Sequence, residues 1–291
     1  MVKVLPEVIK MAGYFRAEGI VLKSRDYQET DQLLTILTPS HGKVDAIVKG
    51  VRKPKSSLRS GTQQLCRSRF LFYAGKSLAT VTQCEVQSIF APLRQDLRRL
   101  AYACYLVEIA DSVVMPGQVN PAMYNLLKQG LELLAGVPPG LVARAFEART
   151  LKILGLEPRL DRCASCGGPL RSTGRVIVAP AAGGTICPDC RGREGPEYQV
   201  MPGSIKIWQQ LNHMNWRNLQ RLQISPYLAR ELEEIMPAFL EYYLDRKLKS
   251  RALINEIGGN DDDGTGKNRP VARALRIKLP GSQGGPGAGR R

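Results

Sequence analysis

Histidine is nearly absent from this chain of 291 residues, which contains only His41 and His213. His41 stands in a turn-forming segment and His213 near the end of a helical one, so neither belongs to a catalytic triad or a metal-activated water site. The segment Gly75-Lys76-Ser77 resembles the end of a phosphate-binding loop, but Phe70 occupies a position where that motif requires glycine. No catalytic motif remains, and we do not expect an enzyme.

Long apolar runs are absent as well. Even the apolar stretch Tyr105–Met115 contains Glu108 and Asp111, so no segment is suited to cross a bilayer. Residues 1–13 are interrupted by charges and lack the apolar core of about 7 residues or more that a secretory signal needs. We therefore expect a flexible leader at residues 1–13 and a cytoplasmic protein.

Acidic residues are outnumbered, with 26 Asp and Glu against 42 Lys and Arg and a net charge of +16. This excess favours a polyanionic partner such as nucleic acid, or an anionic membrane surface. Residues 14–90 hold 12 basic and 6 acidic groups, so positive charge concentrates near the N-terminus. The 43% hydrophobic content excludes wholesale disorder, and the length predicts about two domains. A tail rich in Gly, Pro and Arg, residues 258–291, is predicted to be disordered.

Residues 14–90 predict five short strands, because runs of aliphatic, β-branched and aromatic residues alternate there with turn formers. Two of the turn-forming segments, residues 39–43 and 74–76, fit hairpin loops. Five strands in about 75 residues suit a small barrel such as the OB-fold better than a two-sheet sandwich. The predicted strands are Tyr14–Lys23, Leu33–Thr38, Val44–Lys49, Leu65–Tyr73 and Leu78–Val86.

From Pro92 onward the apolar residues recur every three or four positions, which predicts an α-helical domain over residues 91–257. Asn120 precedes Pro121, the pattern of an N-cap followed by proline at the first helical position. Further helices are predicted over residues 139–154 and 225–249.

Four of the seven cysteines form two C-x-x-C pairs, Cys163/Cys166 and Cys187/Cys190, with 20 residues between them. Each pair lies beside turn formers, so together they are able to present four thiolates to one tetrahedral ion and leave no open position for substrate. This spacing predicts a closed structural Zn²⁺ site within residues 160–195. The alternatives are two unrelated turn pairs, or a redox pair, which would open a helix after a strand. The predicted fold class is therefore α+β: an N-terminal OB-fold barrel, an α-helical domain carrying a zinc knuckle, and a disordered tail.

A basic loop, residues 49–59, connects the third and fourth predicted strands and contains no acidic residue. Its five cations are Lys49, Arg52, Lys53, Lys55 and Arg59. We expect Gly50 and Pro54 to hold the loop away from the barrel, where it would act as an electrostatic clamp for phosphates. Lys23, at the end of the first predicted strand, and Arg25, two residues beyond it, join the loop as candidate DNA ligands. The alternative is a solvated loop without a ligand, which is the commoner role of an isolated basic run.

Aromatic side chains that are able to stack on bases are few in the barrel region. By strand alternation, about half of them should point into the core. They are Tyr14, Phe15, Tyr27, Phe70, Phe72 and Tyr73.

Several motifs occur together in this chain. They are YFRAEGIVLKSRDY at 14–27, ETD at 29–31, LLT at 33–35, TPSHGK at 38–43, KGVRKPK at 49–55, LGLEP at 154–158 and the four-cysteine knuckle. In combination they resemble the bacterial RecO family of DNA repair proteins, over about residues 13–257. The resemblance implies an OB-fold followed by an α-helical domain that a zinc knuckle interrupts. Residues 1–12 and 258–291 lie outside it.

The resemblance also implies a function, that of a recombination mediator in DNA repair. Members of the family bind single- and double-stranded DNA, anneal complementary strands, and act with RecR and the C-terminal tail of single-stranded DNA-binding protein to help load RecA. Their place is the cytoplasm, in association with the nucleoid. An adaptor that recognises acidic peptides, with DNA contact secondary, is the alternative. A zinc nuclease is disfavoured, because it would need an open metal position.

Overall fold

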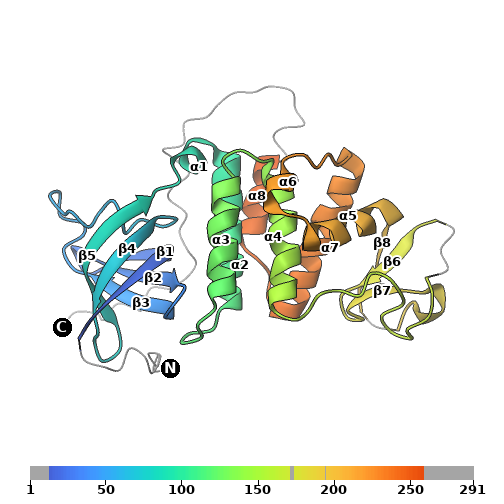
Figure 1. The fold of residues 1–291 in the computed structure, drawn as a ribbon, viewed down its shortest axis with the longest axis horizontal. Coiled ribbons are helices and arrows are strands. Elements are labelled where there is room, and N and C mark those ends of the chain that lie inside the picture. Colours follow the sequence, from blue (N-terminus) through green and yellow to red (C-terminus); the bar gives the residue numbers. More distant parts are fainter. Residues whose placement is uncertain (1–12, 171–173, 194, 259–291) are drawn as a thin grey trace, which may run out of the picture.

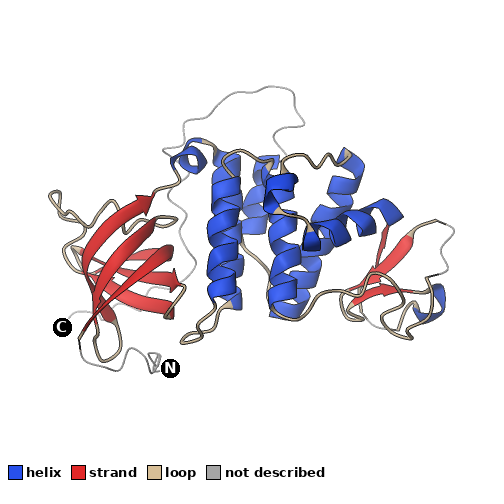
Figure 2. Cartoon of the chain, viewed as in Figure 1, coloured by secondary structure: helices blue, strands red, loops and turns tan. Residues whose placement is uncertain are grey.

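The computed structural model describes residues 13–170, 174–193 and 195–258. The predicted leader, apart from Gly13, and the predicted tail, apart from Gly258, lie outside these residues. A β-barrel, a group of helices and a small β-sheet follow one another along the long axis of the molecule (Figures 1 and 2).

Five strands close into a barrel in the order β1-β2-β3-β5-β4, with β3 and β5 parallel and the other neighbours antiparallel. This is the arrangement of an OB-type barrel, so the predicted fold of the N-terminal region is confirmed. The two predicted hairpins are confirmed as well, because β2 pairs with β3 and β4 with β5. The strands are β1 (Tyr14–Tyr27), β2 (Asp31–Thr38), β3 (Gly42–Val48), β4 (Arg67–Tyr73) and β5 (Ala79–Ser88).

Alternate residues of the strands fill the barrel, where Phe70 and Phe72 pack with aliphatic side chains. Tyr14, Tyr27 and Tyr73 are exposed, so about half of the barrel aromatics are core, as predicted. Strand β1 continues past its predicted end to Tyr27. Its last residues are polar and carry no apolar signal, but they pair with β2 across a tight turn.

Eight helices occur in the part of the chain that the structure describes. The predicted N-cap at Asn120 is confirmed, because its side chain accepts a hydrogen bond from the backbone N–H of Met123 at 2.9 Å. Helix α7 ends at Leu244 and not at residue 249 as predicted. Asp245 adopts the left-handed conformation there, and the chain turns back to bury Leu248. The helices are α1 (Ala91–Gln95), α2 (Leu97–Val113), α3 (Pro121–Leu133), α4 (Pro139–Ile153), α5 (Pro202–His213), α6 (Trp216–Leu219), α7 (Pro226–Leu244) and α8 (Ser250–Gly258).

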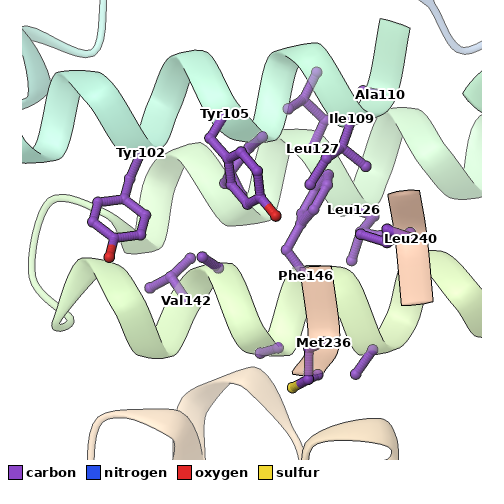
Figure 3. Packing of buried hydrophobic residues seen from close by; sticks show 14 of the residues in the cluster. Tyr102, Tyr105, Ile109, Ala110, Leu126, Leu127, Val142, Phe146, Met236 and Leu240 are labelled. Atoms are coloured by element: carbon purple, nitrogen blue, oxygen red, sulfur yellow. The ribbon is translucent and has the colours of Figure 1, made fainter. Parts of the chain in front are cut away.

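The helical core forms where α2, α3, α4 and α7 meet (Figure 3). Tyr105, Leu127 and Phe146 point toward one another in it. The same core continues into the barrel, because outward-facing barrel residues are buried in it. These are Ile20, Leu22, Leu37 and Leu65. The barrel is therefore fixed on the helices by a shared apolar core.

A buried ion pair lies inside the helical core. The Arg144 guanidinium and the Tyr105 hydroxyl both donate to Glu147 Oε1 at 2.5 Å, whereas Glu147 Oε2 has no hydrogen-bond partner among the described residues. Burial raises the pKa of the Glu147 carboxyl to about 7, although the positive charge of Arg144 opposes the shift. The hydrogen bond from Tyr105 on α2 ties the Glu147 carboxylate, and with it α4, to α2, at the electrostatic cost of burying the charged pair.

This cost predicts a pH dependence. The unfolded carboxyl has a pKa near 4.5, so the native state binds more protons between about pH 4.5 and 7, and the free energy of unfolding should fall as the pH rises through that window. The fall should be about 3 kcal/mol at most, at about 1.4 kcal/mol per pKa unit. Glu147→Gln removes the titration, so the difference in unfolding free energy between wild type and variant should change by about this amount between pH 5 and 8 in urea titrations.

The exposed Glu234→Gln variant serves as the control for this experiment. A wild-type minus Glu147→Gln difference that is the same at both pH values would show that Glu147 stays ionised in the native state.

Candidate metal centre and nucleic-acid interface

A small sheet, which was not predicted from the sequence, holds the cysteine pairs at the end of the molecule away from the barrel (Figure 1). It consists of β6 (Val176–Ala179), β7 (Gly184–Ile186) and β8 (Tyr198–Val200), in the order β7-β6-β8. Strands of three or four residues are too short to show an alternation in the sequence. The Ala164 N–H donates to Thr185 O at 2.7 Å, which ties the first cysteine pair to β7.

Each cysteine pair is held in a turn by backbone hydrogen bonds. In the first, the Gly167 N–H donates to Cys163 O and the Cys163 N–H to Gly168 O, both at 2.9 Å. Gly167 has φ +74°, a conformation that favours glycine. In the second, the Cys190 N–H donates to Cys187 O at 3.0 Å, within a short 3₁₀ turn.

All four predicted ligand atoms come together. The sulfurs of Cys163, Cys166, Cys187 and Cys190 lie within 4.8 Å of one another, and Cys166 Sγ is 3.8 Å from Cys187 Sγ. Metal–thiolate bonds of about 2.3 Å in a tetrahedron place neighbouring sulfurs about 3.8 Å apart. Cys166 is exposed and the other three are buried. The cluster is therefore able to hold a metal ion with all four tetrahedral positions filled by cysteine sulfurs.

The thiols of this cluster differ in acidity. Burial raises the pKa of Cys163, but backbone N–H groups of Cys166 and Cys187 outweigh it and lower the value to about 6. Burial and the three neighbouring sulfurs raise the pKa of Cys190 to about 12. The protein alone favours the thiolate of Cys163 and disfavours that of Cys190, so a bound cation is needed for these two to ionise together.

A carboxylate joins this unit to the helices. Glu231, on α7, accepts hydrogen bonds from the Met201 N–H at 2.8 Å and from Ser204 Oγ at 2.6 Å, which caps the N-terminus of α5. Its other oxygen lies 3.4 Å from Arg175 Nη1, just before β6. Glu231 itself is buried, although it is a charged residue on an amphipathic helix.

The basic loop is anchored on the barrel and does not stand away from it as expected. Val51 is buried in the barrel core and Leu58 is partly buried against it. The Gly50 N–H donates to Asp31 Oδ1 at 2.8 Å, and the Arg52 N–H to Thr30 O at 2.9 Å. Anchors at both ends give the loop a defined shape while its cations remain at the surface.

All five cations of the basic loop are exposed. Arg52 has a weak partner, because its guanidinium lies 3.6 Å from the Asp26 carboxylate, and both side chains are largely in water. An exposed pair of this kind contributes about 0 to 1 kcal/mol, so a phosphate is able to displace Asp26. Arg25 is exposed on the neighbouring part of β1.

Lys23, another predicted DNA ligand, makes a contact that its sequence neighbours do not reveal. Its ammonium pairs with Asp111 at the end of α2, and Lys43 Nζ lies 3.1 Å from the same carboxylate and 2.7 Å from Asp111 O. A phosphate at Lys23 would compete with Asp111, which makes Lys23 a weaker candidate than Arg25. Asp111 was missed as a structural residue, because it is 88 positions from Lys23 and 68 from Lys43.

Asp111 forms a latch between barrel and helices, and its removal is expected to be costly. Burial raises its pKa, but the Lys23 hydrogen bond and the charge of Lys43 outweigh it and lower the value below 3.8. Its stabilisation is therefore present above that pH and lost as the pH falls below it. Asp111→Asn should lower the free energy of unfolding at pH 7 by about 2 kcal/mol, because hydrogen bonds to charged groups are lost. Urea titration measures this.

Lys43 and Lys23 provide an internal comparison for the latch. Lys43→Ala should lower the free energy of unfolding more than Lys23→Ala does, since the Lys43 side chain is 12% exposed and the Lys23 side chain 61%. The reverse order would contradict a latch centred on the buried pair.

The fold and site together define a class. A closed OB-type barrel with a basic loop, fixed to helices that carry a four-cysteine centre, belongs with the OB-barrel proteins, which bind oligonucleotides or oligosaccharides, and the net charge of +16 favours the former. Within residues 13–170, 174–193 and 195–258, no helix has the length and apolar character needed to cross a membrane.

Comparison with known proteins identifies the family. Two family models match, one described as "Recombination protein O N terminal" at residues 11–90 and one as "Recombination protein O C terminal" at residues 94–252. The DNA repair protein RecO of Moorella thermoacetica is 75% identical over 264 residues, which cover 91% of this chain and 99% of that protein. Those of Desulforamulus reducens and Alkaliphilus metalliredigens are 34% and 37% identical, over 84% and 79% of this chain and 94% of each relative. The chain belongs to the RecO family of DNA repair proteins.

Proposed function

We propose that this protein is a DNA-binding recombination mediator. It binds single- and double-stranded DNA, anneals complementary strands without nucleotide turnover, and helps RecR load RecA on DNA coated by single-stranded DNA-binding protein, whose C-terminal tail it contacts. It acts by binding and not by catalysis, in the cytoplasm at the nucleoid. Membership of a DNA repair family and the excess of basic charge support this proposal.

The basic loop carries the proposal. Its five exposed cations lie within eleven residues without an acid, on a loop that the barrel core anchors at Val51. A preformed cationic surface pays little ordering entropy when it binds a polyanion, and neutralised phosphates release counterions. In this proposal residues 14–90 are the nucleic-acid-binding domain, and the phosphate ligands are the loop cations with Arg25 and, more weakly, Lys23. Residues 91–257 are the helical domain, with the knuckle at 160–195.

Salt dependence tests the loop directly. Single-strand affinity should fall with log salt at a slope of about −0.7 per phosphate engaged, so five contacts contribute about −3.5. Changing Arg52, Lys53 and Lys55 together to Ala should reduce the magnitude of the slope by about 2 and weaken all sequences alike, because phosphate contacts carry no base information. Fluorescence anisotropy with labelled oligonucleotides at several salt concentrations measures both quantities.

The matched control changes three exposed cations of the helical domain, Lys206, Arg217 and Arg221, to Ala, which alters the net charge equally. If the loop variant keeps the wild-type salt slope, or if the control variant shows an equal reduction of the slope, the loop is solvated without a ligand and the proposed phosphate site is wrong.

We further propose that the four-cysteine centre holds a structural Zn²⁺. Purified protein should contain about one zinc per chain, since structural sites of this type contribute about 10–16 kcal/mol to folding the peptide around them. Cys187→Ser should release the metal and unfold the knuckle while the barrel persists, because the barrel has its own core. Elemental analysis and proteolysis of the knuckle test this, with Cys84→Ser, outside the cluster, as the control. Metal-free wild-type protein with a protease-resistant knuckle would overturn the proposal.

The alternative, an adaptor for acidic peptides, receives less support. A groove of about 390 Å³ lies where β5, α1 and α3 meet, lined by apolar side chains such as Ile89, Leu93 and Leu131. Its one charged lining residue is Glu132, which would repel an acidic peptide. The groove is suited to apolar contact, whereas the five exposed cations of the basic loop lie on the barrel.

A further inference from the structure

Two tyrosines form an exposed pair on the outer wall of the barrel. Tyr14 on β1 is 67% exposed and Tyr73 on β4 is 45% exposed, and the two residues lie opposite each other in the β1–β4 register. Their ring centroids are 5.2 Å apart in an edge-to-face arrangement. Their neighbours Phe15 and Phe72 stack at 4.9 Å on the inner side, so alternation directs the tyrosines outward.

The face of an OB-fold that usually binds oligonucleotides, β2 and β3, offers no ring for stacking here. Its outward positions include Leu33, Thr35 and Ile47, and none of them is aromatic. Leu37, at the end of β2, is buried in the helical core, and Lys43 is held by Asp111. A base that stacks on this barrel must therefore use another wall.

Exposed cations lie on the strands and the turn that carry the tyrosine pair. Arg16, two residues from Tyr14 on the same side of β1, is exposed and has no carboxylate partner among the described residues. Lys76 is exposed in the β4–β5 turn. Arg69 is exposed and lies 3.8 Å from Glu85, a contact too weak to neutralise it. Exposed aromatic rings beside exposed cations are what single-stranded nucleic acid requires, since bases stack on the rings and phosphates pair with the cations.

The tyrosine pair is also connected to the basic loop along the barrel wall. Across one end of the barrel, Ile47 of β3 pairs with Thr80 of β5, Thr80 with Tyr73, and Tyr73 with Tyr14. At a strand spacing of about 4.8 Å, these three steps cover about 14 Å along the wall. Lys49, the first cation of the loop, follows Ile47 by two residues. One single strand of the length that an OB-fold holds, about 4–16 nucleotides, is able to contact both.

We propose that Tyr14 and Tyr73 form a base-stacking platform for single-stranded nucleic acid on the β1–β4 wall of the barrel. This inference rests on the proposed DNA binding and adds a selectivity to it. The basic loop holds any phosphate backbone, whereas the platform holds only unpaired bases, because bases in a duplex are already stacked on each other. The platform therefore biases the protein toward single strands.

The test uses a labelled oligothymidine, an abasic oligomer of the same length and a duplex. Replacing both tyrosines (Tyr14→Ala and Tyr73→Ala) should weaken oligothymidine binding at least about 25-fold, or about fivefold per ring, which corresponds to about 1 kcal/mol each. Binding of the abasic oligomer and of the duplex should not change, nor should the salt slope, since no phosphate contact is lost. Replacing both by Phe should preserve oligothymidine binding, because the rings remain.

The control is Tyr242→Ala, which removes a tyrosine of similar exposure on α7. Equal oligothymidine affinity for wild type and the double Ala variant would overturn the platform and leave a protein partner as the occupant of this wall. Equal losses on the abasic oligomer, or failure of the Phe variants, would also overturn it, since stacking would not be the cause. Wild-type protein that binds no oligomer at low salt would instead sink the proposed DNA binding itself. Wild-type protein should bind oligothymidine more tightly than the abasic oligomer, and this comparison requires no variant.

Discussion

The rest of the structure depends on the apolar core that the barrel shares with the helices. An OB-type barrel of this size has a small interior, and its outer wall would ordinarily be left in water on every side. Here Ile20 and Leu22 on β1 and Leu37 on β2 turn outward into the helical core. Two lysines from the same wall then meet the Asp111 carboxylate at the rim of this contact. Apolar burial supplies the free energy and the ion pairs define the orientation.

Fixing one wall of the barrel decides which surfaces remain for ligands. The helices cover the part of the β2–β3 face near Leu37 and Lys43, while the basic loop, Arg25 and the β1–β4 wall stay exposed. In the proposed binding mode, phosphates would contact the basic loop and unpaired bases would contact the tyrosine pair. Because neither contact reads base identity, the arrangement suits a protein that must act on any sequence.

The four-cysteine unit is stabilised in another way. Its own apolar cluster is small and includes three of the cysteines, so the metal ligands form part of their own core. The unit is tied to the helices through the buried Glu231, which accepts hydrogen bonds from the start of α5 and faces Arg175 before β6. A metal ion bound there would stabilise a short sheet that has too little apolar surface to be stable by itself.

By itself, the sequence determined the features whose physics is local. Strand alternation over residues 14–90, the Asn120 cap and the two C-x-x-C pairs act over a few residues, so they could be predicted together with the family. The strands β6 to β8 could not, because segments of three or four residues are too short to show an alternation in the sequence. Only the tertiary structure decided that Lys23 is held by Asp111, that Val51 anchors the basic loop and that Tyr14 and Tyr73 meet. Such contacts join residues tens of positions apart, and their energy exists only after the chain has folded.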